Sequence, residues 1–288
     1  MHTVIGLNII EQYIPESYQP TPFQMLTTNP FAEISSTIPP VAMQTFLVIM
    51  ILLVITGTIF DVIHKKSAKY FFQNMKKTKS ASDRQIGGGE TTKIALATAA
   101  HDVLASGEFC NARRRIAHLL TMYGFIFFAA TTSIMIFSFS NGSSSTPTIL
   151  PLLWHLGALM VCVGGYWFWF FIRVDVAAEG NSPFRFMLAD LFVVSLVACT
   201  TFALIWSFAL GTGSEFWSWF FFLLFVASTL ALFGGVPWSK FAHMFFKPAA
   251  AFEKRISEAN GTMNNLPEPA DKPAQFGLGI KRQLPRQY

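Results

Sequence analysis

Five long apolar stretches limit what this chain can fold into. They run from Val41 to Ile63, Ile116 to Phe139, Ile149 to Ile172, Phe186 to Leu210 and Phe216 to Val236. A bilayer core about 30 Å thick requires roughly 20 apolar residues in a helix, because each residue rises only about 1.5 Å. The sequence therefore predicts an all-α integral membrane protein, folded as a five-helix transmembrane bundle. We expect the first stretch to be a true span, since its polar lead is too long for a cleaved signal sequence.

The composition supports a membrane protein and excludes several other classes. Only 13% of the residues are charged, about half the share found in soluble domains. The net charge of +5 does not indicate nucleic-acid binding, because the basic residues follow a membrane topology rather than forming one binding face. Cys110, Cys162 and Cys199 are far apart and in no Cys/His cluster, so the chain encodes neither a disulfide framework nor an iron–sulfur or zinc site.

The basic residues also predict the orientation of the spans. All 21 Lys and Arg residues fall in three segments: Lys65 to Arg115, Arg173 to Arg185 and Lys240 to Arg286. Three other segments contain none: residues 1–38, 141–148 and 211–215. Lys and Arg in short loops stay on the cytoplasmic side. We therefore predict a multi-pass protein of the bacterial inner membrane, with the N-terminus outside the cytoplasm and the C-terminus inside it.

Three regions follow from this topology. Residues 1–38 form an N-terminal extracytoplasmic segment, residues 39–248 the membrane domain with its cytoplasmic loop 64–115, and residues 249–288 a cytoplasmic tail. In the loop, Thr91–Ser106 is typical of a short helix, which either lies on the membrane or a partner or packs on its own bundle. The tail after Phe252 is polar and rich in proline, so we expect it to be largely disordered when free, with an end suited to folding onto a soluble partner.

Histidines near the membrane boundaries are candidate haem ligands. A haem b between two helices needs one neutral imidazole from each helix at the same depth. His118 opens the second span and His243 follows the fifth, so both lie at the cytoplasmic level, and His64 is an alternative there. Arginines before the second span and a lysine after the fifth are placed to pair with haem propionates: Arg114, Arg115 and Lys240. Without a haem, the same side chains are ordinary interfacial anchors.

Other residues have both a functional and a structural interpretation. Gly124 permits close approach of either a helix or a flat cofactor. His155, beside Trp154 near the opposite face, is either a donor to a quinone headgroup or part of an interfacial pair, and His64 is a second quinone candidate. The intramembrane acids are candidates for a proton path, but capping or ion pairing is favoured for both: Asp61 and Asp190. The sequence contains no recognisable catalytic triad, phosphate loop or metal motif, so independent catalysis is not expected.

Three motifs carry a resemblance to a known family. The run Pro237-Trp-Ser-Lys-Phe-Ala-His243-Met-Phe-Phe-Lys-Pro248 resembles the end of the gamma subunit of respiratory nitrate reductase, a membrane cytochrome b in which this histidine ligates haem. Asp190-Leu-Phe-Val-Val-Ser-Leu-Val is similar to the start of that family's fourth span. Arg114-Arg-Ile-Ala-His118-Leu-Leu-Thr-Met-Tyr-Gly124-Phe is closer to two subgroups, the membrane subunit of the quinone-interacting oxidoreductase complex and the membrane anchor of adenylylsulfate reductase. The chain has no fused iron–sulfur domain, so the anchor is the better fit.

The chain departs from this family at two positions. Two-haem members carry further histidines where this sequence has Phe128 and Phe225. Phenylalanine does not ligate iron, so a haem near the outer face is not expected. We expect the Phe-rich interior to fill that volume, including Phe220, Phe221 and Phe222. The resemblance implies one haem b on the cytoplasmic side, ligated by His118 and His243, and a haem-free anchor with the same fold is the alternative.

The function that the resemblance implies is electron transfer at a membrane. The chain would anchor a cytoplasmic flavin and iron–sulfur enzyme, adenylylsulfate reductase with its alpha and beta subunits, and link it to the quinone pool during sulfur oxidation. Alone it would not be an enzyme. A purely structural anchor without a redox cofactor and a small transporter are the other classes. The lack of internal repeats and of polar residues at mid-membrane disfavours the transporter.

Overall fold

The fold is a bundle of membrane-spanning helices. The computed structural model describes residues 21–262, except 65–66, 81, 83, 108, 110, 143–144, 174–175, 177–179 and 240–242, together with residues 275–276 and 280–281. Five helices in this part are long and apolar enough to cross a membrane: α3 (Pro40–His64), α6 (Ala112–Ser138), α7 (Ile149–Trp167) with η3 (Phe168–Ile172), η4 (Leu188–Asp190) with α9 (Leu191–Gly211), and α10 (Glu215–Gly234). The predicted five-span all-α membrane bundle is confirmed.

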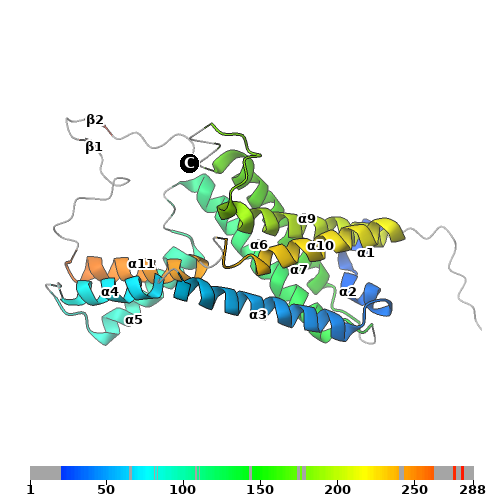
Figure 1. The fold of residues 1–288 in the computed structure, drawn as a ribbon, viewed down its shortest axis with the longest axis horizontal. Helices are drawn as coiled ribbons and strands as arrows, with labels where there is room; N and C mark the ends of the chain where they lie inside the picture. The colour runs from blue at the N-terminus through cyan, green and yellow to red at the C-terminus, as the bar shows by residue number, and fades with distance from the viewer. Residues whose placement is uncertain are drawn as a thin grey trace, which may run out of the picture.

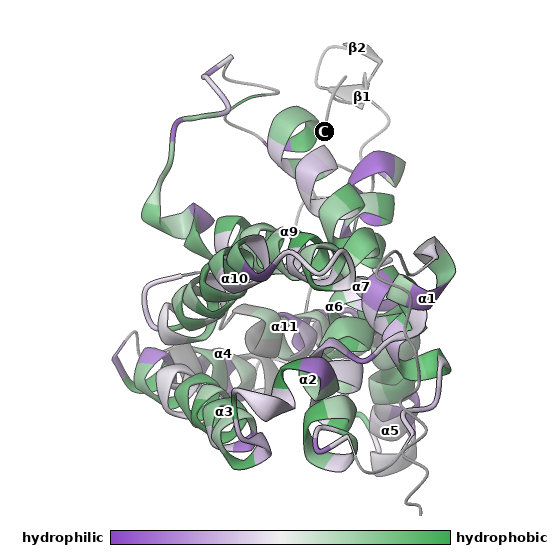
Figure 2. Ribbon diagram, turned by 90° about the vertical axis from the view of Figure 1, so that its right-hand side faces the viewer, coloured by the Kyte–Doolittle hydropathy of each residue, from purple (hydrophilic) through white to green (hydrophobic). Residues whose placement is uncertain are grey.

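The spans pack as two tight pairs with one outlying helix. α6 packs along α7, α9 packs along α10, and α7 joins the pairs by contacting α9. α3 rests against α6 and α10 at the edge of the bundle (Figure 1). Only four of the 25 residues of α3 are buried: Met43, Met50, Gly57 and Asp61. Apolar residues lie on every side of the spans (Figure 2), as expected for helices surrounded by lipid.

Glycines set the close spacing of α6 and α7. A Cβ atom added at Gly124 would lie 2.7 Å from the carbonyl oxygen of Gly157, and one added at Gly164 would lie 2.7 Å from that of Ala117. Real Cβ atoms essentially never approach other atoms this closely. These positions therefore require glycine for helix packing, as small residues do at many membrane helix interfaces.

The two ends of the bundle carry different structures. We call the end where α3 stops and α6 starts the basic end, because the Lys- and Arg-containing segments emerge there. At this end lie α4 (Ser67–Ser80), α5 (Gly88–Ala97), the π-helix η2 (Thr98–Leu104) and α11 (His243–Ala259). α11 contacts α4, α5 and η2, and Figure 1 shows these helices gathered beyond the end of α3. A two-residue antiparallel pair, β1 (Gln275–Phe276) and β2 (Ile280–Lys281), lies further along the tail.

The opposite end is closed by short helices that precede the first span. These are α1 (Pro22–Thr27), α2 (Pro30–Glu33) and η1 (Ile34–Ser36). Asn29 is buried and holds them in place, donating from its side-chain amide to the carbonyl of Phe139 and the hydroxyl of Thr146, both at 3.1 Å. Phe31 then inserts between Trp154 and Trp206, with ring centroids 6.0 and 5.5 Å away. The polar segment before the first span thus contributes a core residue, Phe31.

The tail differs from its prediction. Disorder after Phe252 was wrong for the residues up to Ala259, because α11 continues to that point with Ser257 buried, and Asn260 just after it is buried as well. The predicted boundary between residues 248 and 249 falls inside this helix. The end of the tail, predicted to fold onto a partner, lies outside the described residues apart from the two short strands.

The packing of α6 on α7 makes Gly124 sensitive to the smallest enlargement. We expect Gly124→Ala to destabilise the protein by about 1–3 kcal/mol, the usual range for overpacking, despite the better helix propensity of alanine. Gly234→Ala is the matched control, since a Cβ atom there meets nothing within 4 Å. Thermal unfolding in detergent measures both variants, and equal midpoints would contradict the close contact.

Candidate functional site

The candidate site lies at the basic end, where α6 begins. Asn111 caps this helix, its side-chain oxygen accepting hydrogen bonds from the backbone N–H groups of Arg113 at 2.9 Å and Arg114 at 3.4 Å. An asparagine in this position satisfies backbone donors that have no partner inside the helix. The cap places three arginines in the first turn and His118 one turn further on.

A loop residue fixes the ring of His118. Its Nδ1 lies 2.9 Å from the hydroxyl of Ser106, and its ring packs 4.9 Å from that of Phe109. Ser106 is 1% exposed and adopts a left-handed backbone conformation with φ of 49°. The segment that follows η2 therefore orients the imidazole of His118, although the His118 residue is exposed.

The two predicted arginines point to backbone carbonyls. Arg115 donates from Nε to the carbonyl of Ala105 at 2.8 Å, and Arg114 donates from Nη2 to the carbonyl of Ile172 at 3.4 Å. The Nε of Arg114 is buried and has no hydrogen-bond partner among the described residues. Arg114 lies four residues before His118, so both side chains lie on one face of α6.

The second half of the predicted haem site is described only in part. His243 is the first residue of α11, which brings its backbone to the basic end, but its side chain lies outside the described residues. Lys240, the third predicted propionate partner, lies outside them altogether. The His118–His243 pairing stays a prediction.

Two features of the described residues fit a haem at this end. A haem-ligating histidine usually engages its second ring nitrogen in a hydrogen bond, as His118 does with Ser106. The buried Nε of Arg114 lacks the acceptor that a propionate carboxylate supplies. Gly124 does not fit, because the backbone of α7 already occupies the space beside it.

The predicted quinone residues lie at two ends of the bundle, with the rings of His155 and Trp154 4.9 Å apart near one end and His64 at the other. His155 and Trp154 are core residues near the opposite end, and all of their ring nitrogens are engaged. His155 donates from Nδ1 to the carbonyl of Pro151 at 2.7 Å and pairs through Nε2 with the hydroxyl of Ser207 at 2.9 Å. Trp154 donates from Nε1 to the hydroxyl of Thr132 at 2.9 Å. A quinone bound at His155 would have to displace Ser207.

The remaining candidates are also placed by the structure. His64, at the basic end of α3, is exposed and stacks on Phe60 with ring centroids 5.4 Å apart. Asp190 forms an ion pair with Arg173 at 2.7 Å and accepts a hydrogen bond from the backbone of Met187. The structural interpretation of Asp190 is thus confirmed. Asp61 is buried in α3, 4% exposed.

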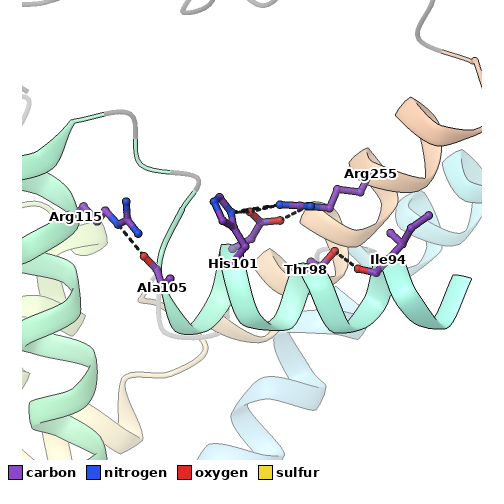
Figure 3. Close-up of polar contacts among 7 residues, drawn as sticks. Ile94, Thr98, His101, Ala105, Arg115 and Arg255 are labelled. Atoms are coloured by element: carbon purple, nitrogen blue, oxygen red, sulfur yellow. Dashed lines mark hydrogen bonds and ion pairs between the residues drawn. The ribbon is translucent and has the colours of Figure 1, made fainter. Parts of the chain in front are cut away.

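The sequence analysis missed an ion pair that joins distant parts of the basic end. Asp102 in η2 accepts two hydrogen bonds from Arg255 in α11, from Nε at 2.6 Å and Nη2 at 2.9 Å (Figure 3). The Arg255 hydrogen bond holds the pKa of the Asp102 carboxyl below its usual value of 3.8, and the pair raises the pKa of Arg255. Of the two interpretations of Thr91–Ser106, packing on its own chain is the one observed.

A large apolar cavity lies between α3 and the rest of the bundle. Its volume is about 520 Å³, and Phe128, Phe222 and Phe225 are among the residues that line it. The rings of Phe128 and Phe225, at the positions where two-haem members carry histidines, are buried and pack on each other with centroids 6.4 Å apart, and Phe221 and Phe222 pack against the same core. The cavity lies beside these rings rather than between them. Phe220 does not line this cavity, and its side chain is 43% exposed.

Known proteins do not supply a family for this chain. Comparisons with protein-family models, with curated proteins and with solved structures found no match. The functional argument therefore rests on the residues and on their arrangement in the bundle.

The ion pair between Asp102 and Arg255 gives a prediction with a defined pH dependence. Because the pKa of Asp102 is lowered in the folded protein, the pair stabilises α11 above the ordinary carboxyl pKa and is lost as the pH falls through the folded pKa. We expect Arg255→Ala to speed amide exchange in α11 about fivefold, which corresponds to a pair worth about 1 kcal/mol. Lys254→Ala, at an exposed neighbouring position, should leave exchange unchanged.

Hydrogen–deuterium exchange followed by mass spectrometry checks both parts of this prediction. In the unsubstituted protein, acidification below about pH 4 should raise the protection-corrected rate of amide exchange in α11, as Arg255→Ala does. Equal protection of α11 in the two variants would show that this ion pair does not hold the helix.

Proposed function

We propose that this protein is a membrane anchor and electron-transfer subunit. It holds a cytoplasmic flavin and iron–sulfur oxidoreductase, adenylylsulfate reductase, at the bacterial inner membrane and links it to the quinone pool. One observation carries the proposal: His118 and Arg114, whose Nε is buried without a hydrogen-bond partner among the described residues, lie on one face of α6. This is the end of the bundle where α5, η2 and α11 form a platform. This puts candidate redox residues directly below a surface outside the membrane-spanning helices.

The charge distribution supports a cytoplasmic position for this platform. Every Lys and Arg lies in segments that emerge at the basic end. The cytoplasmic side retains such residues, so a soluble redox enzyme in the cytoplasm would meet this end. The Asp102–Arg255 pair gives the platform a fixed surface, because it ties the tail helix to the loop between the first two spans.

Each residue has a role in the proposed electron path. His118 and His243 would ligate one haem b, and Arg114 and Arg115 would bind its propionates. A bound haem supplies a carrier that accepts and releases one electron at a time. Ser106 would orient the His118 ring through Nδ1, and Asn111 would place both side chains by fixing where α6 begins. Electrons would come from the partner, which joins sulfite to AMP to form adenylylsulfate and releases two electrons. These two electrons, with two protons from water, would reduce one quinone to its quinol.

A purely structural anchor is the second candidate, and specific contacts favour it. Arg115 is already bonded to the carbonyl of Ala105, both nitrogens of His155 are engaged, and Gly124 is fully used in helix packing. A protein with this role would hold the enzyme at the membrane without carrying electrons. It would copurify with the same partner but show no haem spectrum and no effect of quinone on turnover.

The spectrum of the purified protein separates the two roles. We expect a pyridine haemochrome signal of one haem b per chain, and we expect His118→Ala and His243→Ala each to abolish it while membrane insertion is kept. His101→Ala is the control, since its ring lies at the same end of the bundle and bonds to Asp102. Loss of the signal in His64→Ala would instead make His64 one of the two ligands. A full signal in His118→Ala would refute that ligand, and no signal in the unsubstituted protein would favour the structural anchor.

A further inference from the structure

A second pocket lies at the end of the bundle opposite the basic end. It has a volume of about 230 Å³ and is bounded by α2, η1 and the turn that joins α9 to α10. Two glutamates line it, Glu33 at the end of α2 and Glu215 at the start of α10, together with Trp206 and Trp219. None of these four residues belongs to the candidate site or lines the large apolar cavity.

The two carboxylates of this pocket have no positive side chain to neutralise them. Neither has an ion-pair or side-chain hydrogen-bond partner among the described residues. The sequence explains this, because residues 1–38, 141–148 and 211–215 contain no Lys or Arg. A hollow lined by charge of one sign concentrates counter-ions. The pocket therefore favours a cation over an anion or a neutral molecule.

The indole N–H of Trp206 adds a second requirement. This residue is 0% exposed, and its Nε1 has no hydrogen-bond partner among the described residues. The neighbouring Trp154 differs, because its Nε1 donates to the hydroxyl of Thr132. Three phenylalanine rings pack around Trp206, and a phenyl ring offers no oxygen acceptor. A buried donor without an acceptor is unfavourable, so an oxygen atom placed in the pocket that Trp206 lines would stabilise it.

These two requirements together define the ligand. A bare metal ion satisfies the carboxylates but brings positive charge to an N–H group that can only donate. A simple alkylammonium ion also leaves that N–H without an acceptor. A molecule with an ammonium group and a nearby oxygen atom satisfies both, and the indole rings of Trp206 and Trp219 favour an organic cation.

We propose that this pocket binds a primary ammonium group that carries an oxygen acceptor close to it, as in ethanolamine. The ammonium donates to Glu33 and Glu215, and the oxygen accepts the hydrogen bond of Trp206. Two sources supply this chemistry: a soluble amine on that side of the membrane, and the ethanolamine headgroup of a phospholipid, since the pocket lies where α9 ends and α10 begins. The site uses none of the residues assigned to electron transfer.

Small amines added to the full-length protein in a nonionic detergent test this site. A ligand that binds only the folded protein raises its unfolding temperature, and the rise grows with ligand concentration. Ethanolamine and propylamine are matched probes, because they have the same number of heavy atoms and differ only in the oxygen. At equal pH and ionic strength, we expect ethanolamine to stabilise the protein at about fivefold lower concentration than propylamine. The uncharged 1-propanol should not stabilise it.

Two pairs of variants assign the contacts. Glu33→Gln should weaken ethanolamine binding several-fold, whereas Glu258→Gln, at an exposed position of the basic end, should not. Glu33 is a cleaner probe than Glu215, which lies in the first turn of α10 where negative charge also stabilises the helix. Trp206→Phe removes the N–H and keeps an aromatic ring, so it should lower ethanolamine binding to the level of propylamine and leave propylamine binding unchanged. Trp217→Phe, at an exposed ring outside the pocket, is its control.

Extraction of the lipids that copurify with the protein separates the two sources. Enrichment of phosphatidylethanolamine over phosphatidylglycerol that is lost in Glu33→Gln would assign the headgroup, and ethanolamine binding without this enrichment would assign a soluble amine. Equal stabilisation by ethanolamine and propylamine, stabilisation by calcium chloride instead of the amines, or no stabilisation by any of them would overturn the site. If Trp206→Phe does not fold, the comparison of the two amines on the unsubstituted protein still decides the role of the indole.

Discussion

The bilayer imposes the constraint on which this structure depends: apolar helices must satisfy their own backbone hydrogen bonds, and charged side chains must stay in water. The first requirement makes the five apolar stretches helical, and the second collects all 21 Lys and Arg residues in segments at one end. Where an ionic group is buried near the spans, a partner of opposite charge takes the place of water. Arg173 is only 4% exposed, but it pairs with Asp190 and lies 4.3 Å from the ring centre of Trp169.

Local patterns in the sequence predicted the spans well because hydropathy and helix length are properties of one segment at a time. The predicted ends agree with the observed helices to within a few residues. Contacts between distant segments carry no such signal. From the sequence, Phe31 belongs to the polar segment before the first span and Arg255 to a disordered tail. In the fold, Phe31 packs on Trp154 and Arg255 pairs with Asp102. Gly124 was open to two interpretations because only the neighbouring backbone of α7 decides between them.

The candidate site was predictable to the level of the helix end but not to the level of contacts. Depth along the spans placed His118 at the basic end, and the structure adds the Ser106 hydrogen bond and the buried Nε of Arg114. The cavity along α3 was unpredictable for a different reason. The number of phenylalanines indicates volume, but whether the rings fill a space or border it depends on how closely α3 packs. The structure thus has two separate features, a platform at the basic end and an apolar cavity beside α3 that is open to the surface of the bundle.

The account depends most on the basic end facing the cytoplasm, and thiol labelling tests this directly. Single cysteines are introduced by Ser80→Cys at the basic end and Ser145→Cys at the opposite end, both exposed positions, after the native cysteines are replaced by alanine. A membrane-impermeant maleimide should label Ser145→Cys in intact cells and Ser80→Cys only after permeabilisation. The reverse pattern, or labelling of both in intact cells, would contradict the assigned orientation and remove the proposed docking surface from the cytoplasm.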